Sequence, residues 1–190
     1  MNALKSKFLF VFFAALAATS CRTGRNLHQS ETKNPSTAKE KNVAASHSKI
    51  KATYSTLLGV DEKEVKNMQL YSLIDEWYGT SYKYGGCDKK GIDCSNFISI
   101  LYQELFHISL KGSSASIFNQ CRVIDKKELQ EGDLLFFKPD NKNISHIGMY
   151  LQNNRFVHAT TKKGVMINDL NESYYLNCFY KAARLKELNN

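Results

Sequence analysis

The sequence predicts an α+β domain in which helices come first and a meander of short strands follows. Apolar residues recur at helical spacing between residues 62 and 106, which indicates amphipathic helices. From Asp133 onward, short apolar runs alternate with turn residues, as in antiparallel strands. Helices followed by strands are typical of α+β folds, so we expect the helices to pack on an antiparallel sheet.

The chain begins with a predicted export signal over residues 1–20. Lys5 and Lys7 supply its positive start, and the apolar stretch Phe8–Ala18 is too short to span a bilayer. The small residues before Cys21 resemble a bacterial lipobox, so we expect Cys21 to be lipidated and to become the new N-terminus. The alternative is an ordinary signal peptide followed by a free cysteine. Any membrane attachment would run through the lipid, because the rest of the sequence has no long apolar segment.

Composition divides the remaining chain into a tether and a domain. Up to residue 51 the chain is polar and has no aromatic residue after the signal, so we expect a lipidated cysteine and a disordered tether over residues 21–51. The folded domain is expected over residues 52–190. The net charge of +8 becomes about +6 when Lys5 and Lys7 leave with the signal. An exported protein rarely meets nucleic acid, so we expect no nucleic-acid partner. The positive charge is expected to attract the protein to an acidic envelope; the alternative is that it serves solubility alone.

The predicted domain opens with a helix over residues 62–78, which Gly79 ends. A glycine-rich loop follows. Asp93 then stands where a helix N-cap is expected, and apolar residues from Phe97 to Phe106 keep helical spacing. Cys94 therefore falls in the first turn of a helix, where the dipole and the free backbone amides favour a thiolate.

Short strands fill the second half of the chain. They are expected over residues 133–137, 146–151, 155–159, 165–168 and 179–184. The pair Asn153-Asn154 is expected to form a tight hairpin turn. His146 and His158 lie on the two strands that this turn joins, so antiparallel pairing would bring them side by side.

Cys94 and these two histidines together suggest nucleophilic catalysis. A free cysteine is usually a small buried hydrophobe, but Cys94 has the polar neighbours Asp93 and Ser95 and a helix start. One histidine would take the thiol proton and the other would hold that ring's tautomer, which is the chemistry of covalent acyl transfer. A Cys-His-His zinc site is the alternative; the sequence offers no fourth ligand, so we expect no metal.

Three further cysteines, Cys87, Cys121 and Cys178, are an odd set for an exported protein. One disulfide among them is compatible with the sequence, which does not choose the pair.

Four segments of the chain resemble, in their order, the NlpC-type cell-wall cysteine peptidase family. They are residues 82–97 with the Tyr-Gly-Gly and Asp-Cys-Ser runs, residues 129–137, residues 145–150 and residues 156–159. The resemblance covers roughly residues 65–185. It implies a papain-like α+β fold with the catalytic cysteine at a helix N-terminus, packed on a small antiparallel sheet.

The resemblance also implies roles for individual residues and no cofactor. Cys94 would be the nucleophile, His146 the general base and His158 the orienting residue. Tyr82 matches a tyrosine that lines the site near the oxyanion. Asp93 and Ser95 match positions that help to recognise the peptide stem. Asn96 departs from the pattern, because the family usually has glycine there.

The typical substrate of the family is the peptide stem of peptidoglycan, which a D,L-endopeptidase cuts between γ-D-glutamate and the diamino acid. We expect a monomer in the cell envelope, held by the lipid on Cys21. Arg22 is not the aspartate that retains some lipoproteins at the inner membrane, which favours the outer membrane facing the periplasm. Two alternatives stay open: another thiol hydrolase, such as a wall amidase, and a non-catalytic wall-binding lipoprotein.

Overall fold

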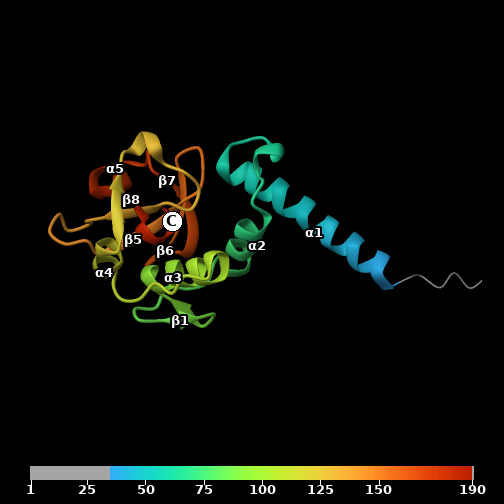
Figure 1. Cartoon of the computed structure of the whole chain (residues 1–190), viewed down its shortest axis with the longest axis horizontal. Helices are drawn as coiled ribbons and strands as arrows, with labels where there is room; N and C mark the ends of the chain where they lie inside the picture. The colour runs from blue at the N-terminus through green and yellow to red at the C-terminus, as the bar shows by residue number, and fades with distance from the viewer. Residues whose placement is uncertain (1–34, 190) are drawn as a thin grey trace, which may run out of the picture. The chain divides into compact units, whose positions relative to one another are not determined.

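The computed structural model describes residues 35–189 of the chain (Figure 1). The expected signal over residues 1–20 and the expected lipidation of Cys21 lie outside the described residues. None of the helices in the described part has the length and the apolar character needed to cross a membrane.

An antiparallel sheet with the strand order β3-β8-β4-β5-β6-β7 forms the centre of the domain, which confirms the α+β class. Its strands are β3 (Cys121–Ile124), β4 (Leu134–Phe137), β5 (His146–Tyr150), β6 (Arg155–Thr160), β7 (Gly164–Asp169) and β8 (Phe179–Leu185). A separate short hairpin consists of β1 (Cys87–Asp88) and β2 (Gly91–Ile92). The helices are α1 (Pro35–Leu58), α2 (Met68–Trp77), α3 (Cys94–Phe106), α4 (Ser114–Asn119) and α5 (Ser173–Cys178), with 3-10 turns η1 (Glu62–Glu64), η2 (Lys126–Glu128) and η3 (Lys186–Asn189).

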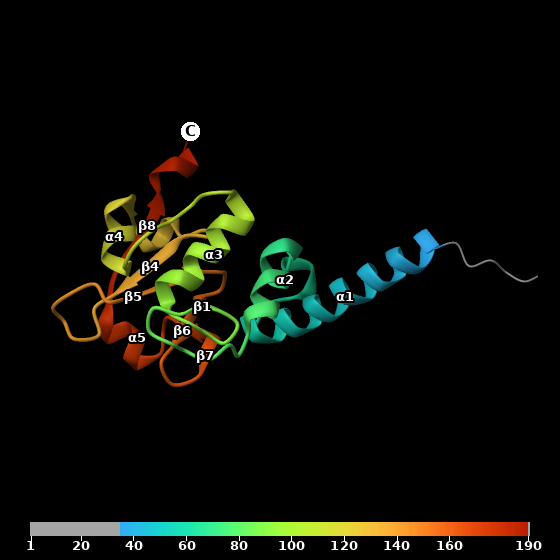
Figure 2. The ribbon, with the colours of Figure 1, turned by 90° about the horizontal axis from the view of Figure 1, so that it is seen from below.

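Both faces of the sheet are covered at its centre. Helix α3 packs on β5 and β6 (Figure 2). In β4, Leu134 and Phe136 belong to the large core that includes the helices, whereas Leu135 and Phe137 belong to a second cluster that includes α5. This explains why β4 is a continuous apolar run: side chains alternate between the two faces of a strand, and here both faces are buried.

The first predicted helix, over residues 62–78, is divided in the structure. Residues 62–64 form the turn η1, and α2 starts only at Met68. The side chain of Asn67 accepts a hydrogen bond from the backbone N–H of Leu70 at 3.1 Å, so Asn67 is the N-cap of a new helix. The helical spacing of the apolar residues is real, but this cap starts the helix later than the spacing alone suggests.

The structure also differs from the predicted tether, because residues 35–51 belong to helix α1. Most side chains from residue 40 to residue 49 are exposed, which is why the segment looks like a tether. The last turns of α1 are anchored, since Ile50, Tyr54 and Leu58 are at most 7% exposed and belong to the main core. These three residues repeat every four positions, which is a helical pattern. The packed domain therefore begins before residue 52.

The other predicted strands are confirmed to within a residue or two at their ends. Asn153 and Asn154 both adopt positive φ, 50° and 58°, as a tight hairpin turn requires. The elements that were not predicted include three short ones, β3, α4 and α5. Each is only four to six residues long, which is too short for a periodic pattern to show.

Candidate active site

Cys94 is the first residue of α3, as predicted. Asp93 is the N-cap: its backbone is extended, and its carboxylate accepts a hydrogen bond from the backbone N–H of Asn96 at 2.7 Å. The thiol is only 5% exposed. The capping interaction therefore holds Cys94 where the free amides of the helix start are available to a negative charge.

The Asp93 carboxylate also joins the preceding loop to the helix. It accepts hydrogen bonds from the Ser95 hydroxyl at 3.0 Å, from the backbone N–H of Gly85 at 3.0 Å and from the side-chain amide of Asn96 at 3.2 Å. The Asn96 amide in addition donates to the carbonyl of Gly86 at 3.0 Å. Asn96 thus adds contacts between α3 and the loop that a glycine at this position cannot make.

The thiol of Cys94 lies among hydrogen-bonding groups from three elements. Its Sγ is 3.7 Å from the hydroxyl of Ser114 at the start of α4, and backbone amides of Ile147 in β5 and Ser95 in α3 also reach it. Burial raises the pKa of the Cys94 thiol above its ordinary value, and these hydrogen bonds offset only part of the rise. Sequence reasoning missed Ser114, because it lies in a serine-rich run without a recognisable motif.

The two predicted histidines are in contact. The Nε2 of His146 in β5 is 2.7 Å from the Nδ1 of His158 in β6. The strands pair antiparallel with Met149 opposite Val157, which places His158 opposite Gly148 and diagonal to His146. A Cβ on Gly148 would lie 2.7 Å from the Phe156 ring and 3.3 Å from the Cβ of His158. Glycine at this position therefore leaves room for the histidine pair.

His158 is almost fully buried, with 1% of its surface exposed, and it has two further polar partners. Its Nε2 is 2.9 Å from the Oδ1 of Asn168 in β7, and the hydroxyl of Tyr175 in α5 lies 3.3 Å from the same ring nitrogen. Burial lowers the pKa of both His146 and His158, so both rings are neutral at neutral pH. Sequence reasoning missed Asn168 and Tyr175, since neither stands in a motif.

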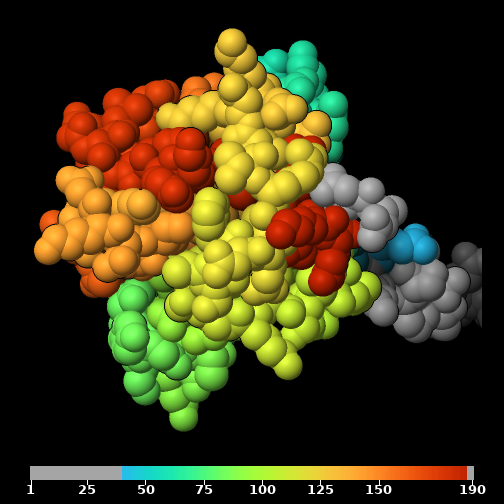
Figure 3. All heavy atoms as spheres, turned by 60° about the vertical axis from the view of Figure 1, so that its left-hand side comes forward, coloured from blue at the N-terminus to red at the C-terminus, as the bar shows by residue number. Residues whose placement is uncertain are grey.

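Tyr82 lies at the same site. It lines a cavity of about 490 Å³ together with His146, His158 and Lys162. Burial raises the pKa of Tyr82, and the nearby charges of Cys94 and Asp93 act in the same direction. In Figure 3 the green surface of the segment before α3 adjoins the orange surface of the second half of the chain. The backbone N–H of Gly79 donates to the carbonyl of Val165 at 2.8 Å, which joins these two segments.

The remaining cysteines take no part in the site. Cys87 is exposed, Cys121 and Cys178 are buried, and all of them are free, as is Cys94. No disulfide therefore forms among the cysteines that the structure describes. Within residues 35–189 the structure shows no group of three or more histidine, cysteine, aspartate or glutamate side chains suited to a metal ion.

Comparison with known proteins decides the family. A model of the NlpC/P60 family matches residues 79–184, which is more than half of the chain. The chain belongs to the NlpC/P60 family. It is 42% identical over 116 residues to a probable endopeptidase NlpC homolog of Haemophilus influenzae, covering 61% of each chain. It is 35% identical over 128 residues to the murein DD-endopeptidase MepS/murein LD-carboxypeptidase of Escherichia coli K12, covering 65% of this chain and 68% of that one.

A solved structure supports the same assignment. A protein of Staphylococcus aureus described as similar to a lipoprotein of the NLP/P60 family superposes with a TM-score of 0.55 at 28% identity, covering 62% of this chain and 40% of that one. The expected papain-like fold, with the cysteine at a helix N-terminus on an antiparallel sheet, is confirmed. In this member of the NlpC/P60 family, the Cys94 thiol lies at the start of α3, and the two histidines lie on β5 and β6.

Proposed function

We propose that this protein is a cysteine endopeptidase that cleaves the peptide stems of peptidoglycan. The observation that carries the proposal is the Cys94 thiol at the capped start of α3, beside a strand whose first residue is His146, itself in contact with His158. The relatives named as endopeptidases support the reaction, and the relative named as a murein enzyme supports the substrate. By the family resemblance, the bond is the one between γ-D-glutamate and the diamino acid.

The geometry supports a role for each group in the proposed reaction. His158 occupies the Nε2 of His146, so the Nδ1 of His146 is the nitrogen left to take the thiol proton. The Cys94 sulfur attacks the amide carbon, and the proton passes from His146 to the leaving amine as the C–N bond breaks. Water, deprotonated by the same nitrogen, then attacks the thioester, releases the acid and returns the proton to the thiol. Backbone amides at the start of α3 and the Tyr82 hydroxyl hold the oxyanion.

Substrate recognition is assigned to the loop and the start of α3. Tyr82 lies at the cavity wall, and Ser95 is held by Asp93 at the helix start. Asp93 is 8% exposed and its carboxylate already accepts four hydrogen bonds, so we propose that it acts on the stem mainly by fixing Ser95 and Cys94.

We propose that the protein works in the cell envelope as a lipid-anchored monomer. The lipid would be on Cys21, and the small residues before that cysteine support this. The mostly exposed stretch of α1 over residues 40–49 would then form part of the spacer between the membrane and the peptidase domain.

The test is the digestion of purified peptidoglycan by the mature chain carrying Cys21→Ser, with Cys94→Ala as the paired control and the products identified by mass spectrometry. Fragments cut after γ-D-glutamate that require Cys94 are expected. Cysteine-dependent cleavage of D,D crosslinks or loss of a terminal residue would move the activity toward the bonds named for the Escherichia coli relative. Loss of whole stems would indicate an amidase, and intact peptidoglycan would indicate a binding role.

A further inference from the structure

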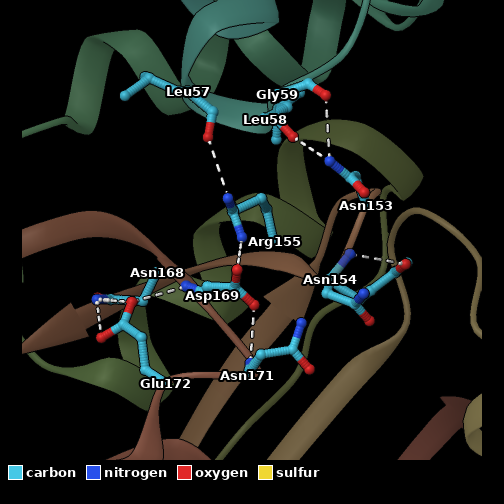
Figure 4. A network of polar contacts seen from close by, with 11 residues as sticks. Leu57, Leu58, Gly59, Asn153, Asn154, Arg155, Asn168, Asp169, Asn171 and Glu172 are labelled. Carbon is cyan, nitrogen blue, oxygen red and sulfur yellow. Dashed lines mark hydrogen bonds and ion pairs between the residues drawn. The ribbon is translucent and has the colours of Figure 1, made fainter.

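The histidine pair is connected to two polar residues on the far side of His158. Asn168 is in β7, and Glu172 is the N-cap residue of α5. The Nδ2 of Asn168 donates to both carboxylate oxygens of Glu172, at 2.8 Å and 3.1 Å (Figure 4). A carboxylate offers only acceptors, so it must face the NH2 group of the amide and not its oxygen.

The orientation of the Asn168 amide then determines the proton on His158. With its NH2 group on Glu172, the amide presents Oδ1 to the Nε2 of His158 at 2.9 Å. The hydroxyl of Tyr175 also donates to this Oδ1, at 3.3 Å, which fits an oxygen at this position. An amide oxygen cannot donate, so the Nε2 of His158 must carry the hydrogen.

The same argument extends to His146. A neutral imidazole has one N–H, so when the Nε2 of His158 is protonated its Nδ1 is an acceptor. That Nδ1 lies 2.7 Å from the Nε2 of His146, which must therefore donate. The Nδ1 of His146 is then unprotonated, which is the state that a general base needs.

We propose that Glu172 and Asn168 are positioning residues that fix the tautomers of both histidines, so that the Nδ1 of His146 is the free base. The inference rests on the proposed function for its catalytic meaning, but the tautomers themselves are a property of the free protein. Neither residue touches the reacting atoms.

Other hydrogen bonds hold the Glu172 carboxylate in place. It can therefore fix the orientation of the Asn168 amide and, through it, the hydrogen-bond relay from Glu172 through Asn168 and His158 to His146. The Oε1 of Glu172 accepts a hydrogen bond from the backbone N–H of Asp169 at 2.9 Å. The carboxylate of Asp169 is paired with Arg155 and accepts from the backbone N–H of Asn171 at 2.8 Å (Figure 4). The guanidinium of Arg155 also donates to the carbonyl of Leu57 in α1, at 3.3 Å. The turn between β7 and α5 is thus tied to the rest of the domain.

The direct test is the ¹⁵N spectrum of the histidine side chains in the mature chain with Cys21→Ser, without substrate. Protonated and unprotonated ring nitrogens have different ¹⁵N chemical shifts. The variants His158→Gln and His146→Gln each remove the signals of one ring and so assign them. We expect Nε2–H on both rings, with Nδ1 of His146 unprotonated. Glu172→Ala and Asn168→Leu should convert this into a mixture of tautomers, whereas Asn171→Ala, an exposed neighbour outside the relay, should not. Nδ1–H on His146, or spectra that Glu172→Ala and Asn168→Leu leave unchanged, would overturn the proposal.

Kinetics on peptidoglycan fragments give the second test. Asn168→Leu should lower kcat by about 10- to 100-fold with little change in KM, as found for other hydrogen bonds that orient a histidine. In the double variant Asn168→Asp with Glu172→Gln, the new carboxylate at position 168 still accepts from the Nε2–H of His158, and the new amide at position 172 donates to that carboxylate. The double variant should therefore have a higher kcat than Asn168→Leu. Equal losses in both variants would show that position 168 acts by packing alone. If the wild type cleaves no stem, the proposed function fails while the spectra still decide the relay.

Discussion

The carboxylate of Asp93 is expected to be a structural requirement of the site, and Asp93→Asn tests this with a minimal change. The amide oxygen of the variant still accepts from the Asn96 backbone and from Ser95. Its NH2 group then faces the backbone N–H of Gly85 and the Asn96 amide, which are both donors and lie 3.0 Å and 3.2 Å from the carboxylate oxygen that it replaces. Because Asp93 is 8% exposed, little water reaches these groups.

The expected cost follows from these contacts. A buried donor that loses its acceptor costs about 1–3 kcal/mol, so we expect Asp93→Asn to lower the free energy of unfolding by about 2 kcal/mol. Asp93→Ala also loses the N-cap, which is worth about 0.5–2 kcal/mol, so we expect about 3 kcal/mol. Urea unfolding at equilibrium measures both values, with the slope unchanged.

A matched control separates this cost from capping in general. Asp125 is the N-cap of η2 and accepts from the backbone N–H of Lys127 at 2.9 Å, but this contact is exposed. Asparagine caps helices as well as aspartate does, so Asp125→Asn should change stability by less than about 0.5 kcal/mol. If Asp93→Asn is as stable as the wild type but inactive, the reasoning is refuted, and Asp93 acts on the substrate directly.

Three further predictions concern pH, packing and the N-terminal helix. Burial lowers the pKa of His146 and His158 below the unfolded value of 6.5, so the unfolded chain binds more protons below that pH. The free energy of unfolding should therefore fall as the pH is lowered from 6.5, by up to about 1.4 kcal/mol per pH unit for each histidine. Urea unfolding at several pH values should show a smaller fall for His158→Asn than for the wild type. Gly148→Ala should cost about 1–3 kcal/mol in thermal or urea unfolding, because its Cβ meets the Phe156 ring at 2.7 Å; an unchanged midpoint would contradict this packing. Leu58→Ala should cost about 2–5 kcal/mol, whereas removal of residues 35–46 should leave the unfolding midpoint nearly unchanged; equal effects would contradict the anchoring of α1 by its last turns.

The proposed catalytic trio, Cys94 with His146 and His158, was predictable because each member carries a local signal. Cys94 follows an N-cap residue and opens an apolar helical stripe, and both features are visible in a short window. The histidines lie on strands joined by Asn153-Asn154, whose preference for positive φ fixes a tight turn and hence the pairing. Local rules were therefore enough to place Cys94 at a helix start and to bring the two histidines together on paired strands.

The outer part of the site was not predictable, because it depends on contacts between segments without motifs. Ser114 reaches Cys94 from a six-residue helix, and Glu172 acts through the tertiary position of Asn168. Helix α1 was missed for a different reason. Among the α1 side chains whose burial is described, those in the core belong to the last turns, so the composition of the helix resembles that of a disordered segment although its end is packed.

The role of Cys94 as the nucleophile is tested by the hydrolysis of a defined peptidoglycan stem peptide by three matched proteins: the wild type, Cys94→Ala and Cys87→Ala. The two cysteines are seven positions apart, but only Cys94 stands at the helix start, where the backbone amide of Ile147, the residue after His146, reaches its thiol, and Cys87 is exposed. We expect Cys94→Ala to abolish cleavage while its unfolding midpoint stays close to that of the wild type, and Cys87→Ala to keep wild-type kcat. Cleavage that persists in folded Cys94→Ala would contradict the assignment of Cys94 as the nucleophile.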